Sequence, residues 1–143
     1  MPILAGQIVT ATQLNRLQPK KYGAVGTSAI TGPSTNTDVP GASLTITTET
    51  AANYVVWCVW DANVSGAGTG TLLGRLALDG INQSPLATMN HPASGGRSQP
   101  TQQYIGTLPT AGSHTFKLVA SPLTLQTVQG TNCSILVEIT EII

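Results

Sequence analysis

The sequence predicts an all-β fold, an antiparallel β-sandwich or jelly roll with a short N-terminal helix-bearing arm. Three observations lead to this class. About eight runs of strand-forming residues follow one another with turn residues at regular spacing, and no parallel β-α-β pattern interrupts them. Asp79-Gly80, between two apolar-bearing runs, predicts a two-residue hairpin, because both positions of a type I′ turn need positive φ. One helix-like pattern, Thr10–Gln18, precedes the first strand.

The N-terminal segment differs in pattern from the rest of the chain. Thr10 and Gln13 match a capping box, and Leu14 and Leu17 lie three residues apart on one helix face. A helix of this length is too short to be stable alone in water, so it must dock. It can pack on its own domain or serve as an attachment arm for another protein. The candidate attachment side chains are Ile3, Leu4, Ile8, Leu14 and Leu17.

The domain boundary is predicted between an arm, residues 1–21, and a sandwich domain, residues 22–143. Strands are expected at Tyr22–Ile30, Ser43–Glu49, Asn53–Asp61, Leu72–Asp79, from Ile81 onward, and at Thr101–Leu108, Ser113–Ser121 and Asn132–Ile143. Stretches rich in Gly, Pro and Asn predict loops at Thr31–Gly41, Asn63–Thr71, Ser84–Pro100 and Pro122–Gly130.

The strand at Asn53–Asp61 is the longest dense run of strand-forming residues, and it contains both tryptophans. Successive side chains of a strand point to opposite faces, and here both faces are apolar. One face belongs in the core, whereas the other needs a second cover. The strand can lie wholly inside one subunit, but 143 residues of β-structure rarely make three layers, so an oligomer interface is expected. The candidate interface residues are Tyr54, Val55, Trp57 and Trp60.

Composition excludes several classes of partner. The chain has six Lys and Arg and six Asp and Glu, so its formal net charge is zero, and charged residues are 8% of the total. Ordinary globular domains contain about 25% charged residues. Nucleic acid and anionic membrane surfaces both demand clustered Lys and Arg, so neither is expected as a partner. No stretch has the pattern of a secretory signal or of a membrane span. An uncharged surface favours association with other copies.

No catalytic, metal or cofactor site is predicted, and we expect no enzymatic activity. His91 lies in a loop, and His114 shares the apolar face of a strand with Phe116, which is typical of a satisfied core or rim histidine. Cys58 and Cys133 lie within predicted strands, far apart in the sequence, and are expected to be buried, reduced thiols. Neither the histidines nor the cysteines have the spacing of a zinc site.

Two loops are candidates for binding a host-surface glycan, which would make the protein a lectin-like module. They are Asn63–Thr71, which contains three glycines, and Ser84–Pro100. Glycan sites commonly use exposed aromatic side chains for stacking, and both loops lack Trp, Tyr and Phe. Phosphate binding by the first loop is not expected, since a strand rather than a helix follows and no lysine is near. The lack of aromatic residues in both loops favours a structural role over glycan binding.

Five stretches together resemble a family of small virion proteins of tailed bacteriophages, especially phages that infect actinobacteria. They are Ala5–Pro19, Val55–Asp61, Gly74–Gly80, Ser113–Ala120 and Leu136–Thr140. Members are described as minor tail, tail-fibre-like or capsid decoration proteins. The resemblance implies a jelly roll of the tumour necrosis factor (TNF)-like type, a trimer displayed on the capsid or tail. It also implies that the chain is made in the host cytoplasm and contacts phage capsid or tail proteins through its arm.

Overall fold

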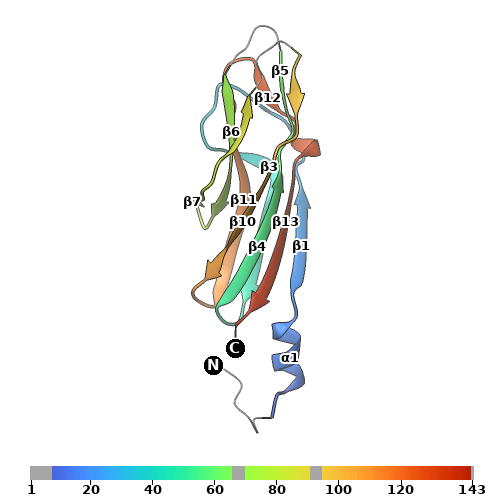
Figure 1. The fold of residues 1–143 in the computed structure, drawn as a ribbon, viewed down its shortest axis with the longest axis vertical. Coiled ribbons are helices and arrows are strands. Elements are labelled where there is room, and N and C mark those ends of the chain that lie inside the picture. Colours follow the sequence, from blue (N-terminus) through green and yellow to red (C-terminus); the bar gives the residue numbers. More distant parts are fainter. Residues whose placement is uncertain (1–7, 66–69, 91–94, 143) are drawn as a thin grey trace.

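The computed structural model describes residues 8–65, 70–90 and 95–142. It shows an elongated β-sandwich, with a short helix beyond one end and a small third sheet at the other (Figure 1). The predicted helix is present: α1 spans Ala11–Leu17, and the Thr10 and Gln13 side chains make the capping box. A 3-10 turn, η1, spans Gly130–Asn132. The strands are β1 Lys20–Val25, β2 Ile30–Thr31, β3 Thr37–Thr48, β4 Ala52–Val59, β5 Ala62–Val64, β6 Thr71–Leu78, β7 Ile81–Asn82, β8 Ala87–Asn90, β9 Arg97–Ser98, β10 Thr101–Leu108, β11 Gly112–Ser121, β12 Gln126–Val128 and β13 Ser134–Glu141.

Strand order confirms the jelly roll. The first sheet has the order β1-β13-β4-β10, and the second has the order β3-β11-β6, with β7 and β8 both paired to β6. The eight principal strands, in chain order, are β1, β3, β4, β6, β8, β10, β11 and β13. The first sheet contains the first, eighth, third and sixth of these strands. The second contains strands two, seven, four and five, and this interleaving is the jelly-roll topology. The tip sheet, of order β2-β12-β5-β9, closes one end of the sandwich.

Large aromatic side chains join the two main sheets across the core. Trp60 is completely buried, and its indole Nε1–H donates to the carbonyl oxygen of Val119 on the second sheet at 3.2 Å. Tyr54 meets Phe116 edge to face, with ring centroids 5.6 Å apart. The Tyr104 hydroxyl accepts a hydrogen bond from the Leu76 backbone N–H at 3.3 Å. The Trp60 indole and the Tyr104 hydroxyl therefore each have a partner, as the low dielectric of a core requires.

The Asp79-Gly80 hairpin forms as predicted. Asp79 has φ 50° and Gly80 has φ 81°, and the paired residues on either side are Leu78 and Ile81. The Asp79 carboxylate also accepts a hydrogen bond from the Thr115 backbone N–H at 2.7 Å, which ties the turn to β11. The hairpin is short and projects beside β6 in Figure 1.

Several predicted boundaries were wrong. β1 begins at Lys20, so Lys20 and Lys21 belong to the sandwich and not to the arm. β3 begins at Thr37, inside a predicted loop. The register of its pairing with β11 shifts in the part of β3 that contains Pro40 and Gly41. The other predicted loops contain β5, β8, β9 and β12, which have two to four residues each. Strands this short have no alternation long enough to be recognised in the sequence.

Candidate interaction surfaces

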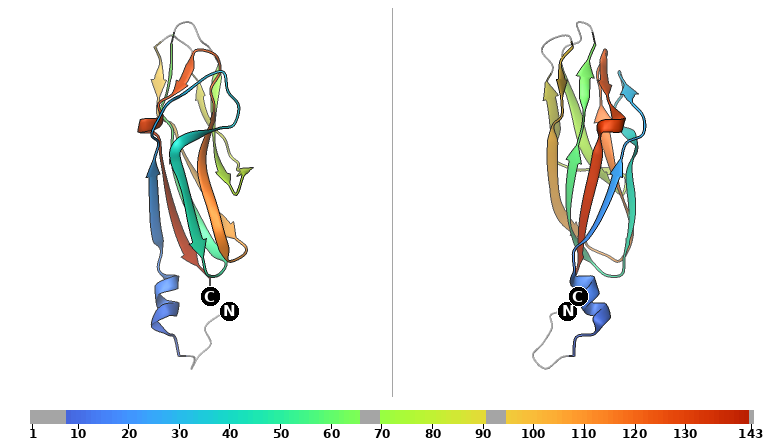
Figure 2. Two further views of the ribbon diagram at one scale, coloured as in Figure 1. Left: turned by 180° about the vertical axis from the view of Figure 1, so that it is seen from behind. Right: turned by 90° about the vertical axis from the view of Figure 1, so that its right-hand side faces the viewer.

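The arm projects from the end of the sandwich opposite the tip sheet (Figures 1 and 2). None of the helix residues is buried. Among the candidate attachment residues, Ile8 is 88% exposed, Leu14 53% and Leu17 36%, whereas Ile3 and Leu4 lie outside the described residues. The arm leaves the domain directly from β1, the edge strand of the first sheet. The side chains of Ile8, Leu14 and Leu17 are thus presented outward rather than packed under their own sheet.

Among the described residues, one ion pair joins α1 to the sandwich. Arg16 Nη1 lies 3.4 Å from Glu49 Oε2, and Glu49 follows the end of β3. Because the Glu49 side chain is largely exposed, this pair is of the surface type, worth about 0–1 kcal/mol. It orients the helix without burying its apolar face. The contact makes the arm a positioned element whose apolar side chains remain available.

The outer face of the first sheet carries the second candidate surface. Trp57 of β4 is 37% exposed on this face, opposite Leu136 of β13 and Gln103 of β10. In the next row, Val55 lies beside Ile105, and both rows are within side-chain contact distance across the strands. Val55, Trp57, Ile105 and Leu136, together called the Trp57 face, form an apolar area with an aromatic centre. Protein interfaces commonly have this composition.

Polar groups border the Trp57 face. Lys21 Nζ and Glu138 Oε2 lie 3.5 Å apart next to Val55, and the Thr107 hydroxyl donates to the Asn53 side-chain oxygen at 3.1 Å. An apolar centre with a polar rim is the arrangement found in specific protein contacts.

Two of the four predicted interface residues were wrong. Tyr54 and Trp60 are 6% and 0% exposed, because their face of β4 packs against the second sheet. A residue buried inside the folded chain cannot meet a partner subunit. Val55 and Trp57 occupy the outer face and remain candidates. The predicted set mixed residues from the two faces of the strand, and the part of it on the outer face stays a prediction.

The segments proposed for glycan binding are partly described. Residues 66–69 and 91–94 lie outside the described residues, and the rest of the two segments forms β5, β8 and β9 with their connections. Within this described part, the two segments gather no aromatic side chain at the surface. The structure therefore adds no support for a stacking site in these segments.

A buried carboxylate organises the junction between the first sheet and the tip sheet. Asp61 is completely buried, and its Oδ1 accepts a hydrogen bond from Arg97 Nε at 2.8 Å. Its Oδ2 accepts from Arg97 Nη2 and, at 3.1 Å, from Gln99 Nε2. The hydrogen bonds from Arg97 lower the pKa of Asp61, burial opposes them, and bonds from Gln99 and Asn132 lower it further.

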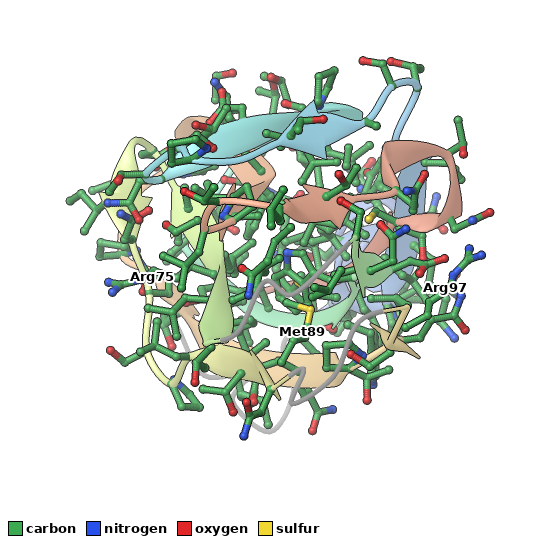
Figure 3. The ribbon with its side chains drawn as sticks, turned by 90° about the horizontal axis from the view of Figure 1, so that it is seen from above. Arg75, Met89 and Arg97 are labelled. Carbon is green, nitrogen blue, oxygen red and sulfur yellow. The ribbon has the colours of Figure 1, made fainter. Side chains whose placement is uncertain are left out.

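This network was missed from the sequence, because Arg97 and Gln99 lay in a predicted loop. The available signal was Asp61 itself, an acidic residue directly after the most apolar run. A carboxylate in that position must either reach water or find a cation, and the chain has only six Lys and Arg. Figure 3 shows Arg97 at the outer edge of the molecule, on the side opposite Arg75, with Met89 in the interior.

His114 has a polar contact at each of its ring nitrogens. His114 Nδ1 lies 2.8 Å from Asp79 Oδ2, and His114 Nε2 lies 3.2 Å from the Thr110 carbonyl oxygen, so the prediction of a satisfied histidine is confirmed. Among residues 8–65, 70–90 and 95–142, no three His, Cys, Asp or Glu side chains cluster so as to hold a metal ion. In the same part of the chain, no helix has the length and apolar character to span a bilayer.

Both cysteines are free and completely buried, as predicted. Burial raises the pKa of each thiol, so the reactive thiolate is scarce. We expect iodoacetamide to modify neither cysteine in the folded protein and both after denaturation without reductant, as read by mass spectrometry. Two unmodified residues after denaturation would show a disulfide instead.

Comparisons with known proteins give little. No family model matches the sequence, and no curated protein matches it. Among solved structures, one that matches is a cycloisomaltooligosaccharide glucanotransferase of Paenibacillus sp., crystallised with cycloisomaltoheptaose. The two are 17% identical with a TM-score of 0.36, and the alignment covers 85% of this chain but 18% of that one. A similarity of this extent does not bear on the function of this chain.

Proposed function

We propose that this chain is a non-enzymatic structural protein of a tailed-bacteriophage virion. It is a jelly-roll oligomer, most simply a trimer, displayed on the particle surface as a capsid decoration or minor tail or fibre protein. Its N-terminal arm fastens it to capsid or tail proteins. The sequence resemblance suggests the setting, and one observation carries the proposal: an amphipathic helix with no buried residue leaves one end of a sandwich that has its own hydrophobic core.

The arm supports attachment by its energetics. Ile8, Leu14 and Leu17 are exposed here, and burying one such side chain completely is worth roughly 1.5–3 kcal/mol. A helix of seven residues does not hold its shape alone, but the capping box and the Arg16–Glu49 pair bias it towards the helical state. If three arms bind together, the second and third attachments become intramolecular, and modest single affinities suffice.

The Trp57 face supports the oligomer. It lies on the first sheet, whereas the arm leaves from that sheet's edge and points along the long axis. Subunits that associate through Trp57, Leu136 and Ile105 around an axis parallel to the long axis would have their arms at one common end. Such an oligomer presents all its arms to the same surface and its tip sheets away from it.

Removal of residues 1–18 tests this function. The chain should start at Pro19, because Lys20 and Lys21 pair with Ile139 and Glu138 in the first sheet. We expect the shortened protein to fold and to form its oligomer, yet to be missing from gradient-purified phage particles. Circular dichroism, light scattering and quantitative mass spectrometry of the particles measure these three properties.

Point variants in the intact arm provide the matched control. Replacing Leu14 and Leu17 by Gln removes the apolar stripe, whereas replacing the exposed Thr12 and Asn15 by Gln changes the same helix elsewhere. The first pair should lower occupancy strongly and the second pair should leave it unchanged. A shortened protein that decorates particles at wild-type occupancy contradicts the proposal. So does one that fails to fold, since the arm would then belong to the domain.

A further inference from the structure

The outer face of the second sheet contains a depression of about 450 Å³. It lies between the first residues of β3, the middle of β11 and the β6–β7 hairpin. Ala77 and Val119 form its floor, and Asp38, Asn82, Thr115 and Lys117 stand around it, with the Asp79-Gly80 turn at one end. This volume falls within the about 300–1,000 Å³ of small-molecule sites.

Residue sizes explain why the sheet is hollow here. Ala77 pairs with Lys117 on one side and with Asn82 on the other, so a single methyl group stands between two longer side chains. Val119 pairs with Asp38 beyond the register shift of β3. Both floor residues face outward and yet are almost fully buried. The result is an apolar floor inside a polar ring.

Contacts within the chain orient part of the polar ring. Lys117 Nζ contacts Asp38 Oδ2 at 2.7 Å, and Asp79 is fixed by the Thr115 backbone N–H and by His114. The Asn82 amide has no hydrogen-bonding partner among the described residues, and Asp38 Oδ1 and the remaining Lys117 N–H groups are also open there. Both donors and acceptors thus border the floor.

These groups select an uncharged polyhydroxyl ligand. The two carboxylates repel a phosphate or another anion, and each already has a partner that competes with a cation. A hydroxyl group both donates and accepts, so it fits a ring of mixed amide, carboxylate and ammonium groups. The lining of the depression has no aromatic side chain for stacking, so the C–H face of a sugar ring would lie on Ala77 and Val119 instead. We propose that this depression, the back-sheet site, binds a neutral saccharide ring.

The back-sheet site is compatible with the oligomer and goes beyond the virion role. It lies on the second sheet, whereas the Trp57 face lies on the first, so association through the Trp57 face leaves it open. It is also separate from the two loop segments in which a glycan site was first expected.

Titration of the full-length protein with free sugars tests the site. The probes are glucose, galactose, mannose and N-acetylglucosamine, with glucuronic acid as the anionic arm, followed by amide ¹H–¹⁵N spectra. At least one neutral sugar should shift the amides of Ala77, Gly80, Asn82 and Val119 in a saturable manner, and glucuronic acid should bind more weakly. Asn82→Ala should weaken binding about tenfold, the effect of one lost hydrogen bond.

Ala77→Leu fills the floor without touching a polar group and should abolish the shifts. Ser113→Leu adds the same bulk on the outer face of β11 outside the depression and should leave binding intact. Both variants should keep the wild-type spectrum elsewhere, which shows that they fold. No saturable shift with any neutral sugar, or shifts that survive Ala77→Leu, would overturn the site. Neither outcome depends on whether the arm binds a virion.

Discussion

Trp60→Ala is expected to destabilise the protein by about 3–5 kcal/mol, the usual cost of truncating a buried Trp. The indole is completely buried and crosses from the first sheet to the second, where it bonds the Val119 carbonyl oxygen. It also covers Gly74, where a Cβ would lie 2.7 Å from the ring. Alanine would leave a cavity and an unpaired carbonyl. A loss of this size is a large share of the total stability of a domain, about 5–15 kcal/mol, and denaturant unfolding measures it.

Trp57→Ala supplies the matched comparison, three residues away on the same strand. Its side chain lies on the outer face and is already 37% exposed. We therefore expect the variant to keep the far-ultraviolet spectrum of the wild type, while the proposed oligomer dissociates to monomers in light scattering. If Trp57→Ala folds and has the same mass in solution as the wild type, the Trp57 face is not the oligomer interface.

The sandwich could be predicted from the sequence because the features that indicate it are determined by residues close together in the chain. The Asp79-Gly80 turn, the Thr10–Gln13 capping box and the alternation in β11 each depend on neighbouring residues, and all three appear in the structure. Which face of β4 lies in the core depends on what packs against the strand, and the sequence pattern makes both faces apolar. Asn53 shares a face with Trp57 and was the one local sign of which side meets water.

The back-sheet site and the Asp61 network could not be predicted for the opposite reason. Each is assembled from segments far apart in the chain, such as Asp61 with Arg97, or Asp38 with Asn82 and Lys117. Their convergence follows from strand order and from the register shift in β3, neither of which leaves a spacing in the sequence. The polar residues themselves look like ordinary solvated ones until the fold places them.

The stability of the wild-type protein is expected to fall on acidification, in part through Asp61. The hydrogen bonds from Arg97 hold its pKa below the ordinary value of 3.8 in the folded state, against the opposing effect of burial. A group whose pKa is lowered by folding contributes stability above its unfolded pKa and loses that contribution as the pH falls through the folded pKa. The contribution is therefore complete above about pH 5 and declines below it. Melting temperatures measured from about pH 6 down to about pH 3 record this decline.

Arg97→Ala should change both the melting temperature and the way in which the melting temperature varies with pH. Removing the cation leaves a buried carboxylate whose largest remaining influence is burial, so the pKa of Asp61 rises relative to the wild-type protein. The variant should melt well below the wild type at neutral pH, and the difference should shrink as the pH falls and Asp61 takes up a proton.

Asp61→Asn in the Arg97→Ala background separates charge from packing. It removes the buried charge while preserving shape, so the double variant should melt higher at neutral pH than Arg97→Ala alone and should lose the changed slope. Other carboxylates, including Asp79, titrate in all of these proteins and cancel in the comparison. If Arg97→Ala keeps the wild-type slope, or if adding Asp61→Asn lowers stability further, the Asp61–Arg97 pair does not act through charge. The junction between the first sheet and the tip sheet would then depend on the shape of its loops.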